Sequence, residues 1–472
     1  MASERSLSQA VAEFGVSTME SGAPPNVRTS AKQRILDILG LQAAALHLDT
    51  SGAALRFVAA QGCKPSAHVV GTSARTSPAW AAFANGVLAH SLDYDDTHMP
   101  SIVHPSATVV PAGLAAAQFH DVSGPAVLDA VAVGIEVVVR LAMAGYDHTT
   151  KDSAFFTHGQ HATSICGAIG AAVTASLIGG ATREAVTDAI GVATSMASGI
   201  IEANRTGGTV KRLHCGWAAH AGLTAADLVD VGFTGPSTAL EGRFGFFEAF
   251  LHGAADQSQV TRELGQRWAV PDIAFKPYPA NHFTHTGFDA ASRLRERGLQ
   301  ADDIAEAVLG VAPSTVRTIG EPLELKQRPE TGYQAQFSGP YMVALGLLGG
   351  SGLGAGLADF TDEVAQEPRR RALMSRIRVE PNETCATIYP YEFPAVLWVR
   401  THRGEEFTEE ALVNRGGRQN PLSEVELHQK FRDNVGVAYP PEVAGRVEQA
   451  LDDLSRGAHG VTEVLAPLGQ PH

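Results

Sequence analysis

Three imidazoles and three carboxylates crowd into residues 90–104, and these side-chain types suit proton transfer. They are His90, Asp93, Asp95, Asp96, His98 and His104. Carboxylates that share a poorly solvated site raise one another's pKa, and beside an imidazole they can hold a proton donor or acceptor near neutrality. We therefore expect this segment to support proton abstraction. Helix capping by Asp and Thr and binding of a divalent cation by Asp and His are the alternatives.

A second imidazole segment covers residues 156–164, where an Ala- and Gly-rich helix is predicted to begin just after His161. The free backbone N–H groups at a helix N-terminus attract anions, and an imidazole adds a charge or a proton there. His161 is thus a candidate site residue. Taken alone, it is equally consistent with an ordinary capping or core histidine.

The charge balance determines where an anionic substrate could bind. A net charge of −14 argues against nucleic acid and anionic membrane surfaces as general partners. An anionic substrate therefore needs local cations, and the loop at residues 204–214 supplies Arg205, Lys211 and Arg212. Arg binds carboxylates through its planar fork and Lys through a compact charge. A solvated basic loop is the alternative.

Two further junctions between a loop and a predicted helix carry candidate residues. In residues 276–285, two prolines fix the chain ahead of an amide and two imidazoles, and residues 326–341 combine phenols with cations. Local evidence supports a capping turn equally well in both places. The candidates from these two segments are Lys276, Asn281, His282, Arg328 and Tyr341.

Helical spacing of apolar residues dominates residues 28–232, which we predict to be all-α. The clearest stripes cover 78–92, 106–119, 125–145, 161–178 and 183–197. Many of these segments are rich in Ala and Gly, which lets helix backbones approach closely. A length of 472 residues exceeds what one core usually serves, so we expect two domains.

The pattern changes after about Gly265, where prolines cluster and short β-type runs appear. These runs cover 305–311, 376–379 and 395–399, and residues 399–407 resemble a hairpin with Gly404 at its turn. Helical spacing returns from Ser423 to about Leu454. We therefore predict an α+β domain followed by helices that return to the first domain.

The sequence lacks the usual signals of several other protein classes. The four cysteines form no CxxC pair, which favours free thiols in a reducing compartment. The G-x-G-x-x-A string within residues 349–356 follows a predicted helix, whereas a dinucleotide-binding turn follows a strand. The N-terminus has no signal-peptide pattern, and the most apolar stretch, 127–144, is interrupted by charges. We expect a cytoplasmic protein.

Four motifs taken together resemble the MmgE/PrpD family, in the same order over residues 8–460. They are Asp93-Tyr-Asp-Asp-Thr97 with a later His104-Pro, the helix after His161, Val210-Lys-Arg-Leu-His214-Cys-Gly, and Lys276-Pro-Tyr-Pro-Ala. The family includes 2-methylcitrate dehydratase, cis-aconitate decarboxylase and iminodisuccinate epimerase. The resemblance implies a mainly α fold, in which a large all-helical domain built from both chain ends carries an inserted smaller α+β lid domain. We place the domain boundaries at 1–265, 266–405 and 406–472.

The resemblance also implies a homodimer and an active site between the domains that uses neither metal nor organic cofactor. By similarity to the decarboxylase branch, Asp93, Thr97 and His104 line the site. His161 and Lys211 then bind or protonate the substrate, and Tyr341 comes from the inserted domain.

This chain departs from the decarboxylase pattern in one place. The pattern has His directly after Pro-Ala, whereas here Asn281 follows Pro-Ala and His282 comes next. A key imidazole is therefore displaced or replaced, which bears on which reaction is catalysed.

The predicted function is that of a cofactor-free lyase, a dehydratase or decarboxylase. Its substrate would be a small di- or tricarboxylate such as 2-methylcitrate or cis-aconitate. Family members share the need to stabilise charge on a carbon next to a carboxylate. We expect Lys211, Arg212 and cations of the inserted domain to hold the carboxylates, Asp93 to orient an imidazole, and one histidine to move the proton. The candidates for that histidine are His104, His161 and His282. The alternatives are an epimerase or isomerase of an iminodisuccinate-like dicarboxylate and a non-catalytic polycarboxylate-binding protein.

Overall fold

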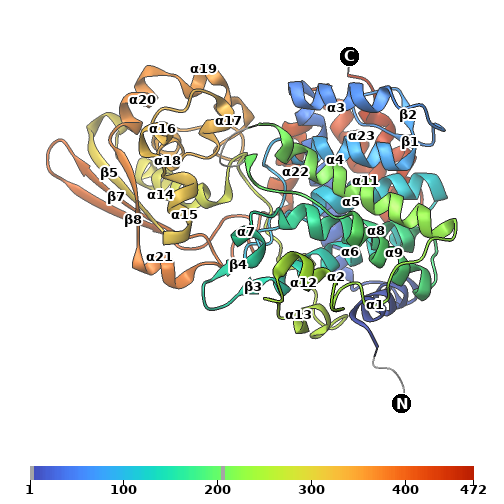
Figure 1. The fold of residues 1–472 in the computed structure, drawn as a ribbon. Coiled ribbons are helices and arrows are strands. Elements are labelled where there is room, and N and C mark those ends of the chain that lie inside the picture. Colours follow the sequence, from blue (N-terminus) through green and yellow to red (C-terminus); the bar gives the residue numbers. More distant parts are fainter. Residues whose placement is uncertain (1–4, 204–207, 472) are drawn as a thin grey trace. The chain divides into compact units, whose positions relative to one another are not determined.

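Helices dominate the computed structural model, which describes residues 5–203 and 208–471 (Figure 1). The chain forms two compact units. The first comprises Met1–Ile273 and Phe431–His472, and the second comprises Ala274–Lys430. The predicted mainly α character is confirmed. Within the described part of the chain, no helix has the length and apolar character required to span a membrane.

The first unit contains most of the helices and two pairs of very short strands. Its helices are α1 (Leu7–Ser21), α2 (Pro25–Ala44), α3 (Asp49–Ala59), α4 (Pro78–His90), α5 (Ser106–His120), α6 (Pro125–Ala144), α7 (Ala154–Thr157), α8 (Ala162–Ile178), α9 (Arg183–Met196), α11 (Val210–Asp230), α12 (Phe246–Leu251), α13 (Ser258–Thr261), α23 (Pro441–Ser455) and α24 (Val461–Leu465). The antiparallel strand pairs are β1 (Ala67–His68) with β2 (Arg75–Thr76), and β3 (Tyr146–Asp147) with β4 (Asp152–Ser153).

The five clearest helical stripes of the sequence correspond to α4, α5, α6, α8 and α9, so those predictions are confirmed. The two strand pairs are the exception to an all-helical reading of this region, because each pairs only two residues across a connection between helices. Such short pairings leave too little alternation in the sequence to be detected.

Glycines let the central helices of the first unit pack at very short range, as their abundance in the sequence suggested. A Cβ atom on Gly86 of α4 would lie 2.7 Å from the Cα of Gly216 in α11. One on Gly170 of α8 would lie 2.7 Å from the carbonyl oxygen of Gly134 in α6. A side chain fits at neither contact, so the helices that carry the candidate site are held by contacts between backbones.

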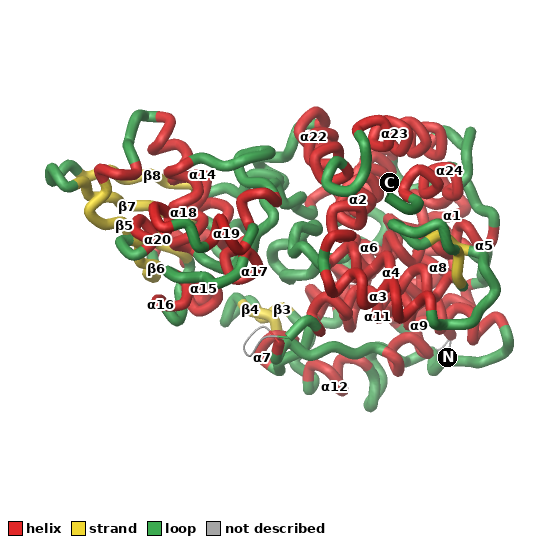
Figure 2. The backbone as a smooth tube through the Cα atoms, turned by 90° about the horizontal axis from the view of Figure 1, so that it is seen from above, coloured by secondary structure: helices red, strands yellow, loops and turns green. Residues whose placement is uncertain are grey.

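The second unit is built on a four-stranded sheet with the order β6-β5-β7-β8 (Figure 2). Its strands are β5 (Ile304–Val311), β6 (Ile377–Pro381), β7 (Ala395–Thr401) and β8 (Glu406–Ala411), and only β5 and β6 run parallel. Its helices are α14 (His285–Glu296), α15 (Pro313–Ile319), α16 (Leu323–Lys326), α17 (Gly332–Ala335), α18 (Gly339–Leu348), α19 (Asp362–Ala365), α20 (Pro368–Met374) and α21 (Glu383–Ile388). Residues of α14, α18 and the sheet share one hydrophobic core. The last long helix before α23, α22 (Glu424–Val435), carries the chain from the second unit back into the first.

The predicted hairpin is present and keeps the chain in the second unit longer than we expected. Strands β7 and β8 pair antiparallel, and Gly404 adopts φ +82° in the turn between them. Since β8 belongs to the sheet, the second unit continues to Lys430, whereas we placed the boundary at 405/406. The glycine tract at 349–356 follows α18, whose C-cap is Gly349, so it is a loop after a helix.

Candidate active site

Four buried imidazoles lie close together in the first unit, where one helix ends and three others begin. They belong to His90, His104, His161 and His214, called the imidazole cluster below. The ring centroid of His90 lies 5.3 Å from that of His104 and 5.8 Å from that of His161, and the His161 and His214 centroids are 4.9 Å apart. His90 ends α4, His104 precedes α5, His161 caps α8 and His214 lies near the start of α11. Residues far apart in sequence therefore form one site.

The three carboxylates of residues 90–104 are each paired with a different cationic or imidazole group. The shortest contacts join Asp93 to Lys211 at 3.0 Å, Asp95 to His90 at 2.7 Å, and Asp96 to Arg34 at 2.7 Å. Each of the three buried carboxylates therefore has a cation or an imidazole beside it that offsets the cost of burying its charge. Among the described residues, no group of three or more His, Cys, Asp or Glu side chains is arranged to hold a metal ion.

The orientation of His104 is fixed by the backbone of its own segment. Its Nδ1 lies 2.7 Å from the carbonyl oxygen of Asp96, and its backbone N–H donates to the Thr163 hydroxyl at 3.2 Å. A carbonyl oxygen only accepts, so Nδ1 carries the proton, and the neutral ring has its basic lone pair on Nε2. The Thr97 hydroxyl lies farther from Nδ1, at 3.4 Å. This tautomer makes His104 suited to act as a base through Nε2.

Asp96 anchors the turn that carries His104. Its carboxylate pairs with the buried guanidinium of Arg34 and accepts from the Ser106 hydroxyl at 2.5 Å. Arg34 also donates to the carbonyl oxygens of Val270 and Ile273. Burial raises the pKa of Asp96, and the charge of Arg34 opposes that rise. Asp96 thereby acts as a structural support for the site.

His161 and His214 form a pair of neutral imidazoles. Their Nδ1 atoms lie 3.0 Å apart, so one ring donates and the other accepts. Burial is the main cause that lowers the pKa of His161 well below its usual value, and it lowers that of His214 to about 4. The backbone N–H of His161 donates to the carbonyl of Gly199, whose φ of +135° allows this close approach. Both rings are uncharged near neutral pH.

Of the three predicted cations of the 204–214 loop, Lys211 is the one that the structure brings to the cluster. It lies in the first turn of α11, and its charge disfavours protonation of both His161 and His214. Arg212 donates to the Thr50 hydroxyl at 2.8 Å. Arg205 lies outside the described residues.

The second unit brings two of its predicted segments together. The backbone N–H of Asn281 donates to the carbonyl of Gln336 at 2.8 Å, which joins residues 276–285 to 326–341. The Asn281 side chain caps a short 3-10 helix (His282–Thr284) by accepting from Phe283 N–H. Lys276 and His282 are buried, and Arg328 is exposed.

Tyr341 lies in the hydrophobic core of the second unit and is fully buried. Its hydroxyl donates to the carbonyl of Asp359, and the Arg370 guanidinium lies 5.1 Å from its ring centroid. Burial raises the pKa of Tyr341 to about 12. These contacts indicate that the Tyr341 side chain packs and forms a hydrogen bond within this core.

Sequence reasoning assigned no role to four residues of the site, Arg34, His90, Asp95 and His214. Arg34 lies among the apolar residues of α2, and a charged residue in such a position is typical of a buried ion pair. His90 and Asp95 belong to the acidic segment that drew attention first, but only the structure shows the hydrogen bond between them. His214 lies in one of the quoted family motifs, but it is far from His161 in the sequence, so the sequence alone does not show that the two rings are in contact.

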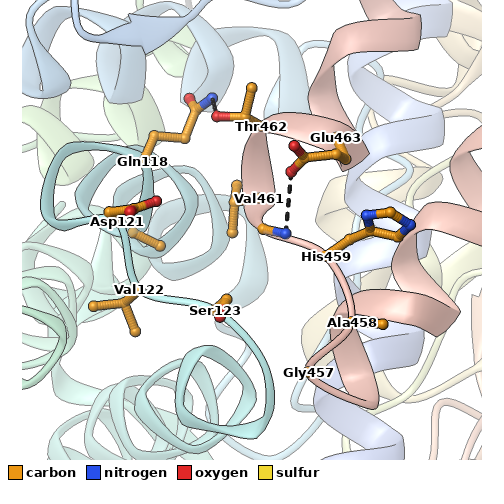
Figure 3. A pocket seen from close by; sticks show the side chains of 12 residues that line it. Gln118, Asp121, Val122, Ser123, Gly457, Ala458, His459, Val461, Thr462 and Glu463 are labelled. Carbon is orange, nitrogen blue, oxygen red and sulfur yellow. Dashed lines mark hydrogen bonds between the residues drawn. The ribbon is translucent and has the colours of Figure 1, made fainter.

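A separate cavity of about 450 Å³ lies elsewhere in the first unit (Figure 3). Its lining comes from the end of α5 with the following turn, 117–123, and from residues 457–463 at the start of α24. Glu463 accepts from the Gly460 N–H at 3.0 Å, and Gln118 donates to the Thr462 hydroxyl at 3.2 Å. The cavity therefore draws on residues other than those of the imidazole cluster.

The fold and the site define a mainly α protein with a buried cluster of imidazoles and carboxylates. Residues 8–259 match the MmgE/PrpD N-terminal domain and residues 278–455 match the MmgE/PrpD C-terminal domain. The chain belongs to the MmgE/PrpD family, as its motifs indicated.

Three curated relatives show the range of functions around this chain. Cis-aconitate decarboxylase of Mus musculus is 30% identical over 423 residues, which cover 86% of this chain and 81% of the relative. The enzyme of the same name from Homo sapiens is 30% identical over 86% of this chain and 82% of the relative. 2-Methylcitrate dehydratase of Salmonella typhimurium is 25% identical, over 87% of this chain and 88% of the relative.

Proposed function

We propose that this protein is a lyase that acts on a small di- or tricarboxylate by moving a proton at a carbon next to a carboxylate. The relatives named above are two decarboxylases and a dehydratase, and both of these enzyme classes are lyases. Cis-aconitate and 2-methylcitrate are the first substrates to test. The proposal rests on family membership together with the geometry of the imidazole cluster.

The observation that carries the proposal is the fixed tautomer of His104. Because Nδ1 donates to the Asp96 carbonyl, Nε2 is the basic nitrogen, and no rotation of the ring is required before it accepts a proton. Thr163 holds the backbone of the same residue from α8. A base that is oriented before the substrate binds loses little entropy in the reaction.

Lys211 and three helix N-termini at the cluster support an anionic substrate despite the net charge of −14. The N-termini of α5, α8 and α11 meet there, and each end carries a partial positive charge. Lys211 adds a full charge, which Asp93 shares in the substrate-free protein. We assign Lys211 to a substrate carboxylate and to the negative charge that develops beside it.

The proposed steps use a neutral imidazole as the base and a protonated imidazole as the acid. In dehydration, His104 Nε2 takes the proton from the carbon beside the carboxylate, and the C–H electron pair forms the double bond. The hydroxyl group then leaves as water with a proton from a second imidazole that is protonated before the step and neutral after it. In decarboxylation, the C–C electron pair stays on the substrate as carbon dioxide leaves, and an imidazolium protonates that carbon.

Residues of the second unit also belong to the proposal. We assign Lys276 and Arg328 to carboxylate binding and Asn281 and His282 to substrate turnover, in keeping with the family motif. Tyr341 is left out of the proton path because its hydroxyl donates to the Asp359 carbonyl. A homodimer, which the family resemblance implies, is likewise a proposal and is tested by sedimentation velocity.

A product screen tests the proposed function. The purified protein is incubated with citrate, 2-methylcitrate, cis-aconitate and aminated dicarboxylates, and the products are identified by mass spectrometry. We expect loss of water or of carbon dioxide from one of them. Turnover that leaves the mass unchanged would identify an epimerase or isomerase instead, and tight binding without any product would identify a binding protein.

A further inference from the structure

The His90–Asp95 pair stands apart from the rest of the imidazole cluster because its ring is bound to a carboxylate. His90 Nδ1 lies 2.7 Å from Asp95 Oδ2, and the two side chains are 1% and 0% exposed. A carboxylate accepts, so Nδ1 carries the proton that is shared with Asp95. Among the residues that the structure describes, none offers a hydrogen-bond partner to the buried Nε2 of His90. That nitrogen is therefore where His90 gains or loses a proton.

The charges around the cluster act differently on His90 and on its neighbours. Asp95 offsets a positive charge on His90, whereas that positive charge lowers the pKa of both His161 and His214. A positive charge on one ring of the cluster therefore disfavours a positive charge on the rings beside it. Several elements contribute ionisable groups around it. They include Asp93, Asp95 and Asp96 on the segment of His90, Arg34 on α2, His104 ahead of α5, His161 at the start of α8, and Lys211, His214 and Cys215 on α11.

We propose that the His90–Asp95 pair is the proton store of the site, which gives its Nε2 proton to the neutral imidazoles that face it. The inference rests on the proposed lyase function and adds two residues to it. His90 exchanges the proton with His104 or His161, whose ring centroids lie within 5.8 Å of its own. Asp95 is a positioning residue that holds the tautomer and stabilises the imidazolium.

The proton balance for decarboxylation is complete without another reactant. The N–H bond at His90 Nε2 breaks as its proton moves to the basic nitrogen of a neutral imidazole of the cluster. The imidazolium that results gives a proton to the carbon that has lost carbon dioxide and returns to its neutral form. The electron pair of the broken C–C bond forms the new C–H bond. His90 is left neutral, with Nδ1–H still donated to Asp95, and solvent restores its proton before the next turnover.

The kinetic test compares His90→Gln and Asp95→Asn with the matched control His98→Gln. His98 lies on the same segment and contacts the Ser101 hydroxyl at 2.7 Å. We expect His90→Gln to lower kcat about 100-fold or more with little change in KM. In Asp95→Asn, the alkaline limb of the kcat profile should move to lower pH by about one unit or more, because the imidazolium loses its anion. Unchanged kcat and pH profiles in both variants would overturn the proposal.

A second measurement does not depend on turnover. Histidines labelled with 13C at Cε1 are titrated by NMR in the wild type and in both variants, and His90→Gln assigns the His90 resonance. We expect His90 to be the last ring of the cluster to lose its proton as the pH rises, and to lose it earlier in Asp95→Asn. If the wild type yields no product, the lyase proposal fails while this titration still decides the role of the pair. A His90 ring that loses its proton before His104 and His161 contradicts the proposal, even if Asp95→Asn does not fold.

Discussion

Lys211 Nζ lies 3.0 Å from Asp93 Oδ1, which joins the first turn of α11 to the turn that follows α4. Asp93 adopts a left-handed φ of 51° there, a conformation that Asp tolerates better than most residues. The two side chains are 13% and 4% exposed, so the pair is largely buried. An incoming carboxylate therefore meets a cation that is already oriented and partly neutralised.

The first prediction concerns this pair. Lys211→Met should lower kcat/KM more than about 100-fold, because it removes the charge that stabilises the developing anion. Removing the Lys211 charge from the largely buried Asp93 carboxylate should also cost about 3 kcal/mol of the free energy of unfolding. Steady-state kinetics and urea unfolding measure the two effects, with the exposed Lys64→Met as control. Wild-type turnover by Lys211→Met would refute the assigned role.

The second prediction separates Lys211 from its neighbour in sequence. The Arg212 guanidinium donates to the Thr50 hydroxyl at 2.8 Å. We therefore expect Arg212→Met to raise KM less than about tenfold and to leave kcat close to wild type, since one exposed or half-buried hydrogen bond contributes about 1 kcal/mol. Kinetics of both variants on the same substrate make the comparison. A loss as large as that of Lys211→Met would instead make Arg212 a direct ligand of the substrate.

The third prediction tests the packing that positions the cluster. A Cβ on Gly216 of α11 would lie 2.4 Å from the Phe83 carbonyl oxygen of α4. Gly216→Ala should thus destabilise the protein by about 2 kcal/mol or more, because the helices must separate. Gly445→Ala is the matched control, since it lies in α23 with open space around it and should stabilise by up to about 1 kcal/mol. Equal unfolding midpoints for the two variants would contradict this account.

The fourth prediction concerns acid stability. His220 lies between Trp80 and Trp217, at ring-centroid distances of 4.2 and 5.3 Å, and burial lowers its pKa to about 4. Between pH 6.5 and 4, the unfolded chain binds a proton at this ring that the folded chain does not bind, so stability falls as the pH falls. Between pH 6.5 and pH 4, the free energy of unfolding of His220→Gln should therefore fall by roughly 2 kcal/mol less than that of the wild type.

Urea unfolding at several pH values measures the effect of His220→Gln. The exposed His148→Gln should follow the wild type. Parallel pH dependences of the wild type and His220→Gln would show that this ring does not contribute.

The helices of the first unit could be predicted from the sequence because their apolar and glycine faces repeat with helical period over long segments. Residues 78–92 and 125–145, for example, correspond to α4 and α6. We predicted that the second unit ends at residue 405, before its actual end at Lys430. The sequence of a hairpin strand such as β8 does not show which unit the strand joins. Such a boundary depends on long-range pairing.

The candidate site was predictable as a set of segments and not as a set of contacts. Residues 90–104 and Lys211 were singled out from charge and spacing, and the structure brings them together. The pairing of Asp95 with His90 depends on the turn that follows α4, and that of His161 with His214 depends on where α8 and α11 meet. Helical periodicity fixes the face on which a residue lies and leaves open which helix end it meets.

The most direct test of the central claim follows the proton in deuterated water. The wild type and His104→Gln are incubated with cis-aconitate and 2-methylcitrate, and the products are identified by mass spectrometry and NMR. The account predicts a product that has lost carbon dioxide and carries one solvent deuterium on the carbon that lost it, or an alkene that has lost water. His104→Gln should form it at about 1% of the wild-type rate or less. Deuterium in recovered substrate with no loss of water or carbon dioxide, or wild-type turnover by His104→Gln, would contradict the account.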